Sequence, residues 1–331
     1  GVISGCSPPK ILEKDQNQIT VNLNDYKRAE EFLSVNVNHL VTDLIKKRHW
    51  GENDQFIYQK VIADDLVTVV ADPKSRNKSF KTSFEEPNKE NNKEHLSPDG
   101  TKAAFIIDYN LWVRDTKTNN ITQLTFNGTE HYGYATNNAG WVRDDRPVLL
   151  WSPDSKKIAT FRHDSRNVGE MYLVSTKVGH PELDAWKYPL PGDDSIFMIE
   201  RIVLHLDSEP RIVKLNMPPD PHRSSTGDHV ADRNGRFIDV EWNAQSDLLA
   251  FVSSSRDHKS AKLRLADPET GEITDIYNET VVTYYESGFI NPNWRILHNR
   301  NEFIWYSEKD DWAHLYLHDL QTGRLKKQLT S

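Results

Sequence analysis

The chain of 331 residues carries a net charge of −8, and 37% of its residues are hydrophobic, which is enough for one large domain or two ordinary ones. An acidic chain without a basic patch is not expected to bind nucleic acid, and a single cysteine excludes an internal disulfide framework. No apolar run approaches the length that a bilayer-spanning helix requires.

Residues 1–20 are polar and include two adjacent prolines, which predicts a flexible tether. The sequence Ile-Ser-Gly-Cys-Ser around Cys6 fits the end of a bacterial lipoprotein signal, in which the cysteine becomes the lipid-modified first residue. The alternative is an unmodified cysteine in a polar terminus. A lipid on Cys6 implies a periplasmic or cell-surface lipoprotein of a bacterium, held to the membrane by that lipid alone.

Residues 21–48 are predicted to form an N-terminal helical segment. Asn24 is suited to cap a helix, and Asp25 is suited to its first turn. The apolar residues that share one face of this helix are Tyr26, Ala29, Phe32 and Leu33. The rest of the chain, residues 49–331, has the pattern of repeated β-structure.

Residues 148–161 are the stretch around which the repeats are organised. An apolar strand ends at Trp151, a Ser-Pro-Asp-Ser turn follows, and a second strand then alternates apolar residues between its two faces. Similar stretches occur at residues 49–58, 95–105, 240–251 and 293–306. The same hairpin is therefore predicted several times along the chain.

A second recurring pattern follows most of these hairpins. It is an alternating strand that ends in an Asp-x-x-Thr-Gly type of turn, at residues 115–119, 267–271 and 319–323. Four antiparallel strands at a period of roughly 40 to 50 residues are typical of β-propeller blades. The sequence thus predicts an all-β propeller of four-stranded antiparallel blades, of which about five are visible.

Two regions interrupt the repeats. The connection at residues 130–146 appears too aromatic and irregular for strands. The third blade carries a long insertion around residues 178–230, within which residues 200–206 and 211–215 are predicted to form an extra strand pair.

The aromatic connection contains the candidate binding residues Trp141, Asp144 and Asp145. Two neighbouring carboxylates in a loop over a cavity can hold a cationic amine. The alternative is that they pair with Arg143 and Arg146 and cap a turn. The residues themselves leave both interpretations open.

No motif for catalysis, metal binding or a cofactor is present. The sequence has no Gly-x-Ser-x-Gly elbow, no cysteine pair, no His-Glu-x-x-His motif and no Gly-rich phosphate loop. The adjacent pairs His163-Asp164 and Asp257-His258 are interpreted as solvated charges in loops. We therefore expect no catalytic residue, no metal and no cofactor in this chain.

The repeats, the helix at residues 25–33 and the Gly-Trp-Val-Arg-Asp-Asp connection before Trp151 together resemble one known family. They are similar to the N-terminal propeller of dipeptidyl peptidase IV-like serine peptidases of the prolyl oligopeptidase clan. Residues 170–192 resemble the bacterial members in particular. The resemblance covers most of the chain, from about residue 26 to residue 331.

This resemblance implies an eight-bladed ring followed by an α/β-hydrolase domain with Ser, Asp and His, so that the chain ends before its last blades and before the catalytic domain. In the family, the ring shields the active site, and a pair of acidic residues after Trp-Val-Tyr binds the free N-terminus of the peptide. Here Trp141-Val142-Arg143 precedes the shorter acids Asp144 and Asp145. The implied partners are peptide substrates, the hydrolase domain and a second copy of the parent protein.

The resulting hypothesis is a non-catalytic, substrate-gating propeller of an extracytoplasmic dipeptidyl peptidase. The alternative is a stand-alone propeller on a lipid tether that acts as a binding or scaffold module. A self-contained hydrolase is a third class, but no nucleophile with a suitable base is visible.

Overall fold

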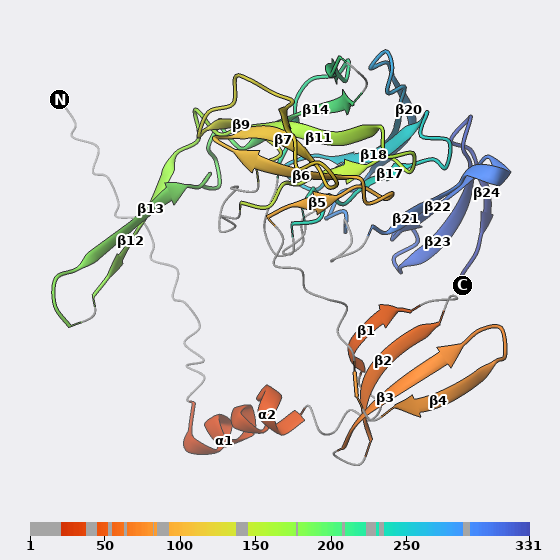
Figure 1. The fold of residues 1–331 in the computed structure, drawn as a ribbon. Coiled ribbons are helices and arrows are strands. Elements are labelled where there is room, and N and C mark those ends of the chain that lie inside the picture. The colour runs from red at the N-terminus through yellow and green to blue at the C-terminus, as the bar shows by residue number, and fades with distance from the viewer. Residues whose placement is uncertain are drawn as a thin grey trace, which may run out of the picture. The chain divides into compact units, whose positions relative to one another are not determined.

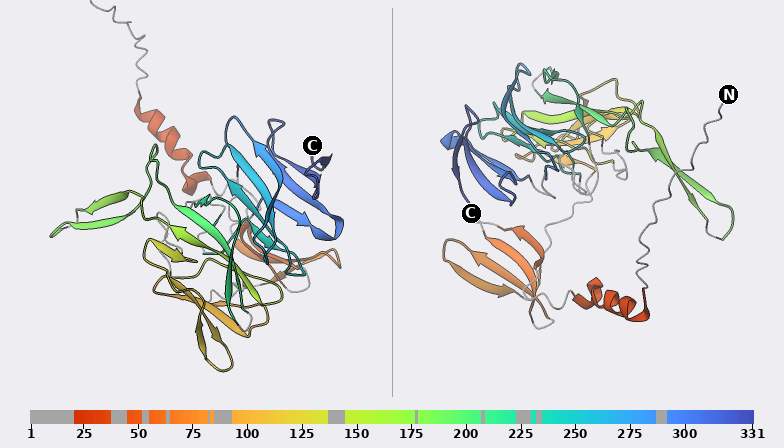
Figure 2. Two further views of the ribbon diagram at one scale, coloured as in Figure 1. Left: turned by 90° about the horizontal axis from the view of Figure 1, so that it is seen from above. Right: turned by 180° about the vertical axis from the view of Figure 1, so that it is seen from behind.

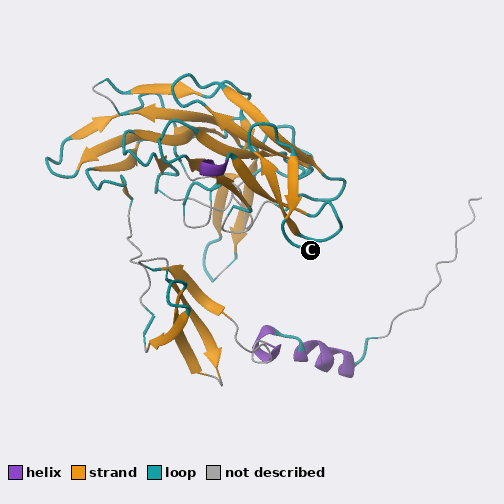
Figure 3. Ribbon diagram, turned by 90° about the vertical axis from the view of Figure 1, so that its right-hand side faces the viewer, coloured by secondary structure: helices purple, strands orange, loops and turns teal. Residues whose placement is uncertain are grey.

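The structure is a computed structural model in which regular secondary structure is almost entirely β (Figure 1 and Figure 3). The residues that it describes are 21–37, 45–51, 55–62, 65–81, 83–84, 93–136, 145–176, 178–206, 209–222, 230–231, 235–286 and 292–331. The chain divides into two compact units, Gly1–Glu90 and Asn91–Ser331.

The first unit contains the predicted helix, α1 (Leu23–Glu31), followed by the short α2 (Ser34–Val37). The side chain of Asn22 accepts hydrogen bonds from the backbone N–H groups of Asn24 and Asp25, at 2.8 and 3.3 Å. The Asp25 carboxylate accepts one in return from the Asn22 backbone N–H, at 3.0 Å. This is a capping box, so the helix begins two residues earlier than Asn24 alone would suggest.

The first unit also holds one antiparallel sheet in the order β1-β2-β3-β4. Its strands are β1 (Ile45–Trp50), β2 (Phe56–Ile62), β3 (Asp65–Asp72) and β4 (Asn77–Lys81). The first strand begins at Ile45, inside the segment that was expected to be helical. Its Lys-Lys-Arg-His run hides the apolar alternation that marks the other strands.

Three sheets of the second unit have four antiparallel strands in sequence order. The first consists of β5 (His95–Leu96), β6 (Lys102–Ile107), β7 (Asn110–Asp115) and β8 (Ile121–Gln123). The second consists of β17 (Val240–Trp242), β18 (Leu249–Ser254), β19 (Ser260–Ala266) and β20 (Ile273–Thr280). The third consists of β21 (Trp294–Leu297), β22 (Glu302–Ser307), β23 (His314–Asp319) and β24 (Leu325–Gln328), with the 3₁₀ turn η3 (His298–Arg300) after β21.

Another sheet of the second unit has six strands. Its path is β10-β11-β14-β15, and outside this path β9 pairs with β11 and β16 pairs with β14. Its strands are β9 (Tyr132–Tyr134), β10 (Leu150–Trp151), β11 (Lys157–Asp164), β14 (Met198–His205), β15 (Arg211–Lys214) and β16 (Asp220–Pro221). The strand pair predicted at residues 200–206 and 211–215 is confirmed as β14 and β15, which pair antiparallel. Its assignment as an addition to the blade is wrong, because β14 and β15 are the third and fourth strands of the blade itself. The region expected to lack strands contributes β9, which pairs with β11.

The true insertion of this sheet is a hairpin of β12 (Glu170–Ser175) and β13 (Glu182–Lys187). Its two strands pair only with each other among the described strands. The hairpin, drawn in green, extends away from the other sheets of the second unit (Figure 2).

Apolar side chains fill the space between successive sheets of the second unit. One buried cluster joins the sheet of β11 to the sheet of β18 and includes Phe161, Val203, Trp242 and Phe251. Equivalent clusters join the sheets of β6 and β11 and the sheets of β18 and β22. The sheets of β11 and β18 thus contribute both of their faces to the core.

The tryptophan that ends the first strand of a sheet also binds the sheet before it. The indole N–H of Trp151 donates to the carbonyl oxygen of His95 at 3.0 Å, and that of Trp242 donates to the carbonyl oxygen of Leu150 at 3.3 Å. Both indoles are buried, with 4% and 7% of their surface exposed. The recurrent tryptophan therefore aligns the first strands of neighbouring sheets.

The Ser-Pro-Asp type turns that follow these first strands also bind the turns of neighbouring sheets. The backbone N–H of Asp99 donates to the hydroxyl oxygen of Ser155, and that of Asp154 donates to Ser246, each at 3.1 Å. Ser155 and Ser246 have φ values of 60° and 62°, so their turns take the left-handed conformation and direct each hydroxyl group toward the preceding sheet.

Candidate functional site

Asp145 is the predicted binding residue that the structure describes. Its carboxylate pairs with the ammonium group of Lys93, with 2.7 Å between Nζ and Oδ2. Both side chains are about 75% exposed, so the pair lies in solvent. The other predicted residues, Trp141, Asp144 and Cys6, lie outside the described residues. A site in which Asp144 and Asp145 together bind an amine therefore stays a prediction.

The surroundings of Asp145 are acidic. Asp108 and Tyr109 form the two-residue turn between β6 and β7, with φ values of 48° and 62° that are typical of a type I′ turn. Burial raises the pKa of the Tyr109 phenol, and the negative charges of Glu130, Asp108 and Asp145 raise it further. Three carboxylates therefore lie close enough to the Tyr109 phenol to raise its pKa, and one of them, Asp145, is paired with Lys93.

Lys93 was not predicted as part of the site, and the next residue shows why it lies there. Glu94 forms two hydrogen bonds with the guanidinium group of Arg114 on β7, at 3.0 and 2.5 Å. The hydrogen bond from Arg114 lowers the pKa of Glu94 below its ordinary value. This pair fixes the chain beside β7 and brings Lys93 to Asp145, although 52 residues separate them in the sequence. The charged residues Lys93 and Glu94 just before β5 are the sequence signal that could have pointed to it.

The histidines of the two pairs that were interpreted as solvated charges in loops are buried, whereas Asp164 is partly exposed and Asp257 is exposed. His163 lies on β11 with none of its surface exposed, and neither of its ring nitrogens has a hydrogen-bond partner among the described residues. His258 lies in a turn, stacks on Tyr284 with 4.2 Å between ring centroids, and faces the carbonyl oxygen of Tyr285 at 3.1 Å. Both histidines are part of the packing rather than surface charges.

The described part of the chain offers no group of three or more His, Cys, Asp or Glu side chains that could hold a metal ion. Within the same residues, no helix is both long and apolar enough to span a bilayer.

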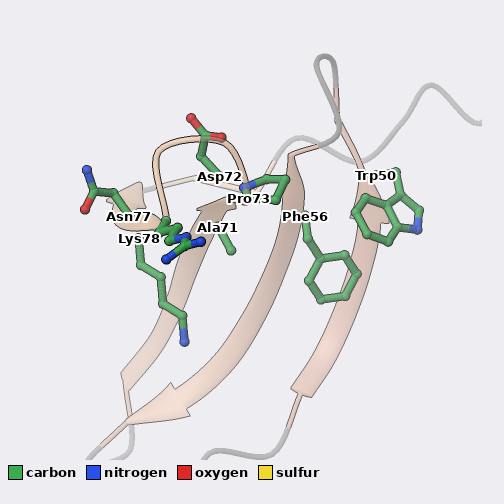
Figure 4. Close-up of a pocket in the computed structure, with 8 residues that line it drawn as sticks. Trp50, Phe56, Ala71, Asp72, Pro73, Asn77 and Lys78 are labelled. Atoms are coloured by element: carbon green, nitrogen blue, oxygen red, sulfur yellow. The ribbon is translucent and has the colours of Figure 1, made fainter. Parts of the chain in front are cut away.

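A pocket of about 550 Å³ lies on the sheet of the first unit, and none of the residues that line it was predicted as a site residue (Figure 4). The aromatic rings of Trp50 and Phe56 form one side of it, with 5.0 Å between their centroids. The other residues that line the pocket are Ala71, Asp72, Pro73, Arg76, Asn77 and Lys78.

Successive four-stranded antiparallel sheets that pack face to face through apolar residues place the chain in the class of repeat β-proteins. Within that class, residues 47–331 match the family described as the dipeptidyl peptidase IV N-terminal region, and the chain belongs to this family.

Individual proteins that resemble this chain have low sequence identity to it. A probable dipeptidyl-aminopeptidase B from Aspergillus fumigatus is 25% identical over 210 residues, which are 60% of this chain and 22% of that protein. The solved structure of Porphyromonas gingivalis dipeptidyl peptidase 4 shares the fold with a TM-score of 0.56 and 19% identity, over 87% of this chain and 40% of that one. A Bacteroides ovatus structure matches with a TM-score of 0.52 and 23% identity, over 84% of this chain and 35% of its own. The chain thus spans about a fifth of the length of its curated relatives.

Proposed function

We propose that this chain is part of the non-catalytic propeller of an extracytoplasmic dipeptidyl peptidase IV-like serine peptidase, and that the propeller controls which peptides reach the active site. The observation that carries the proposal is the family match over residues 47–331, together with four-stranded sheets joined in series. Sheets that share apolar faces form a rigid wall, and a rigid wall around an active site admits extended peptides and excludes folded proteins. In this proposal an α/β-hydrolase domain of the same protein supplies Ser, Asp and His.

We further propose that Asp144 and Asp145 bind the free amine of the peptide. The acidic environment of Asp145 supports this role, because a negative potential attracts an ammonium group. The contact with Lys93 supports it as well, since the carboxylate already binds one primary ammonium group at 2.7 Å. A substrate amine that replaces Lys93 keeps the same charge-assisted hydrogen bond.

The test compares the complete gene product with the 331-residue chain. Both are treated with a serine-reactive fluorophosphonate probe and with chromogenic X-Pro and X-Ala dipeptides. We expect labelling and turnover with the complete gene product and neither with the shorter chain. Turnover by the shorter chain would require a nucleophile within it. If neither protein were labelled or turned over the dipeptides, the stand-alone binding propeller would be favoured.

The role of the two aspartates is tested in the complete gene product with the Asp144→Ala/Asp145→Ala variant. We expect a KM about 10-fold or more higher for substrates with a free amine, from the loss of roughly 1.5–3 kcal/mol in hydrogen bonds to a charged group. The exposed Asp247→Ala variant is the matched control. Equal kinetics for free and blocked N-termini in the unaltered enzyme would rule the amine site out.

Anchorage through a lipid on Cys6 is part of the same proposal and has its own test. The complete gene product is expressed in a bacterium, and its N-terminal peptide is analysed by mass spectrometry. A diacylglycerol adduct on Cys6, absent from the Cys6→Ala variant, is the expected result. An unmodified Cys6 would refute the lipoprotein assignment and leave the peptidase assignment untouched.

A further inference from the structure

Two pairs of neighbouring sheets in the second unit meet through the same kind of turn. The Asp-x-x-Thr-Gly turn after β19 contacts β15, and the equivalent turn after β23 contacts β20. A Cβ atom on Gly271 would overlap the carbonyl oxygen of Lys214, and one on Gly323 would overlap that of Ile276. Lys214 and Ile276 are each the fourth residue of their strand. We call these contacts the first and the second seam, and the backbones approach similarly closely in both.

Polar and charged side chains from the sheet of β11 fill the first seam. Nε2 of His205 donates a hydrogen bond to the carbonyl oxygen of Pro268 in the turn, at 2.8 Å, and His205 is only 2% exposed. Arg211 and Lys157 place their cationic groups against the carboxylate of Glu269, the next residue of the turn. One imidazole and two cations therefore hold the turn of the first seam.

The second seam has smaller or uncharged side chains at the corresponding positions. The strand register and the order of residues in the turn define which residues correspond. In place of His205, Arg211, Lys157 and Glu269, the second seam has Ala266, Ile273, Leu249 and Gln321. At these positions it therefore has neither the imidazole nor the two cations that hold the first seam.

A pocket of about 390 Å³ lies in the second seam. Its lining comes from both sheets, and its apolar residues are Leu248, Leu265, Ala266, Ile276 and Leu320. Leu320 corresponds to Pro268, so its carbonyl oxygen stands where the first seam has the acceptor for His205. Ala266, which replaces that histidine, has no side-chain donor. The pocket is thus an apolar space beside a backbone acceptor that the first seam supplies with a donor.

The charged residues that line the pocket are Asp267 and Glu272, and both are acidic. The carboxylate of Asp267 accepts hydrogen bonds from the backbone N–H groups of Glu269 and Thr270, at 2.7 and 3.2 Å. These hydrogen bonds lower the pKa of Asp267, so it stays ionised at neutral pH. Glu272 is exposed just before β20. Negative charge beside an apolar space favours a ligand with a positive end and an apolar body.

We infer that this pocket binds a small organic cation, namely a guanidinium or ammonium group on a short alkyl chain. The cation supplies N–H donors for the carbonyl oxygen of Leu320 and positive charge for the carboxylates of Asp267 and Glu272. The first seam takes both from its own side chains. The alkyl chain covers Leu248 and Ile276, which are partly exposed. A free alkylguanidine and the arginine side chain of a peptide share this chemistry.

Titration of the methyl-labelled 331-residue chain with hexylguanidinium, followed by NMR, tests the site. We expect a dissociation constant on the order of 0.1–1 mM. The shifted signals should be the methyl groups of Leu248, Leu265, Ile276 and Leu320. Hexylurea has nearly the same shape without the charge, and it should bind about 10-fold more weakly because it loses the attraction to the carboxylates. Equal binding of hexylurea, or shifts confined to other methyl groups, would overturn the inference.

Two substitutions separate charge from space. Glu272→Gln removes one carboxylate at an exposed position and should weaken hexylguanidinium binding about 5-fold without affecting hexylurea. Glu308→Gln, at an exposed residue outside the pocket, is the matched control. Ala266→His fills the pocket as His205 fills the first seam, and should abolish the binding of both compounds. Unchanged affinity in Glu272→Gln would overturn the inference even if Ala266→His failed to fold.

Two further ligands distinguish the sources of the cation. Agmatine, a guanidinium group on an aminobutyl chain, represents a free cation, and acetyl-Gly-Arg-Gly-amide represents an arginine in a peptide. Tighter binding of agmatine would identify a free cation as the occupant, and tighter binding of the peptide would identify an arginine side chain. No dipeptide turnover enters these measurements, so their outcome is independent of the proposed peptidase role. If neither ligand displaced hexylguanidinium, the inference would be overturned.

Discussion

At the scale of single residues, the protein surrounds some polar side chains with apolar groups and leaves others in solvent. His163 has the rings of Phe197 and His222 as neighbours, with centroids 5.4 and 5.1 Å away. Burial lowers the pKa of His163 to about 4, although the negative charge of Asp164 opposes the shift. The native state therefore holds this imidazole neutral at physiological pH.

The low pKa of His163 predicts a pH-dependent stability. The unfolded chain binds a proton near pH 6.5, whereas the native state binds it only near pH 4. The free energy of unfolding should therefore fall as the pH drops through this window, by about 3 kcal/mol in total. Urea denaturation of the His163→Phe variant between pH 7 and pH 4 should show a flatter profile. The exposed His180→Phe variant should retain the original slope.

The exposed contact between Lys93 and Asp145 leads to a different kind of prediction. If a substrate amine takes the place of Lys93 on Asp145, the Lys93→Met variant of the complete gene product should bind such substrates more tightly. We expect a KM roughly 2- to 5-fold lower, because exposed ion pairs contribute up to about 1 kcal/mol. Lys117→Met, at an exposed turn, is the control. A KM that rises would mean that Lys93 orients Asp145 rather than competing for it.

At the scale of elements, the turns determine how closely two sheets approach. Gly271 ends the Asp-x-x-Thr-Gly turn after β19 with a φ of 78°, and a Cβ atom there would overlap the carbonyl oxygen of Lys214 on the neighbouring sheet. Gly323 has the same relation to Ile276. In the copy after β7, Asn119 takes this position with a φ of 61°. The glycines thus serve both the turn and the contact between sheets.

Gly271→Ala and Gly100→Ala separate these two contributions. Gly100 has a φ of 68° but nothing within 4 Å of its would-be Cβ, so the substitution there should cost only the backbone strain, about 1–2 kcal/mol. Gly271→Ala should cost roughly 1–3 kcal/mol more, because the sheets must also move apart. Equilibrium denaturation of both variants measures the difference. Equal losses would show that the sheets adapt without cost.

At the scale of the whole second unit, buried polar contacts join neighbouring sheets through residues that are far apart in sequence. Arg201 on β14 and Asp220 on β16 form an ion pair at 2.8 Å, and their side chains are 3% and 8% exposed. Ser253 on β18 donates a hydrogen bond to the same carboxylate at 2.7 Å. The guanidinium group of Arg201 also lies over the ring of Phe251. One charge pair therefore couples two neighbouring sheets.

Removing one charge of the Arg201–Asp220 pair should lower the free energy of unfolding far more than removing both. Asp220→Asn leaves the Arg201 charge buried, so we expect a loss of about 3–5 kcal/mol in the free energy of unfolding. Adding Arg201→Met should recover a large part of this loss. A double-mutant cycle by chemical denaturation gives the coupling, with Lys93→Met as the control for an exposed pair. Additive effects would contradict a coupled pair.

Much of this architecture follows from local sequence. Ser-Pro-Asp-Ser after Trp151 encodes its own turn, because proline restricts φ and the aspartate and serine side chains bind the following backbone. Alternation of apolar residues encodes strands such as β11 and β18. The four-stranded repeat and the family were therefore predictable. The polar strand β1 was not, since its alternation is weak.

The rest was decided by contacts between residues that are far apart along the chain. Sequence shows a tryptophan at the end of several first strands, but only packing against the preceding sheet buries Trp151 and Trp242. It shows His163 beside a charged Asp164, but only the tertiary structure brings Phe197 and His222 against the imidazole and buries it. The sequence shows Lys93 before a blade, but only the Glu94–Arg114 ion pair positions Lys93 next to Asp145. Turns and strands depend on neighbours in sequence, whereas burial and charge pairing depend on neighbours in space.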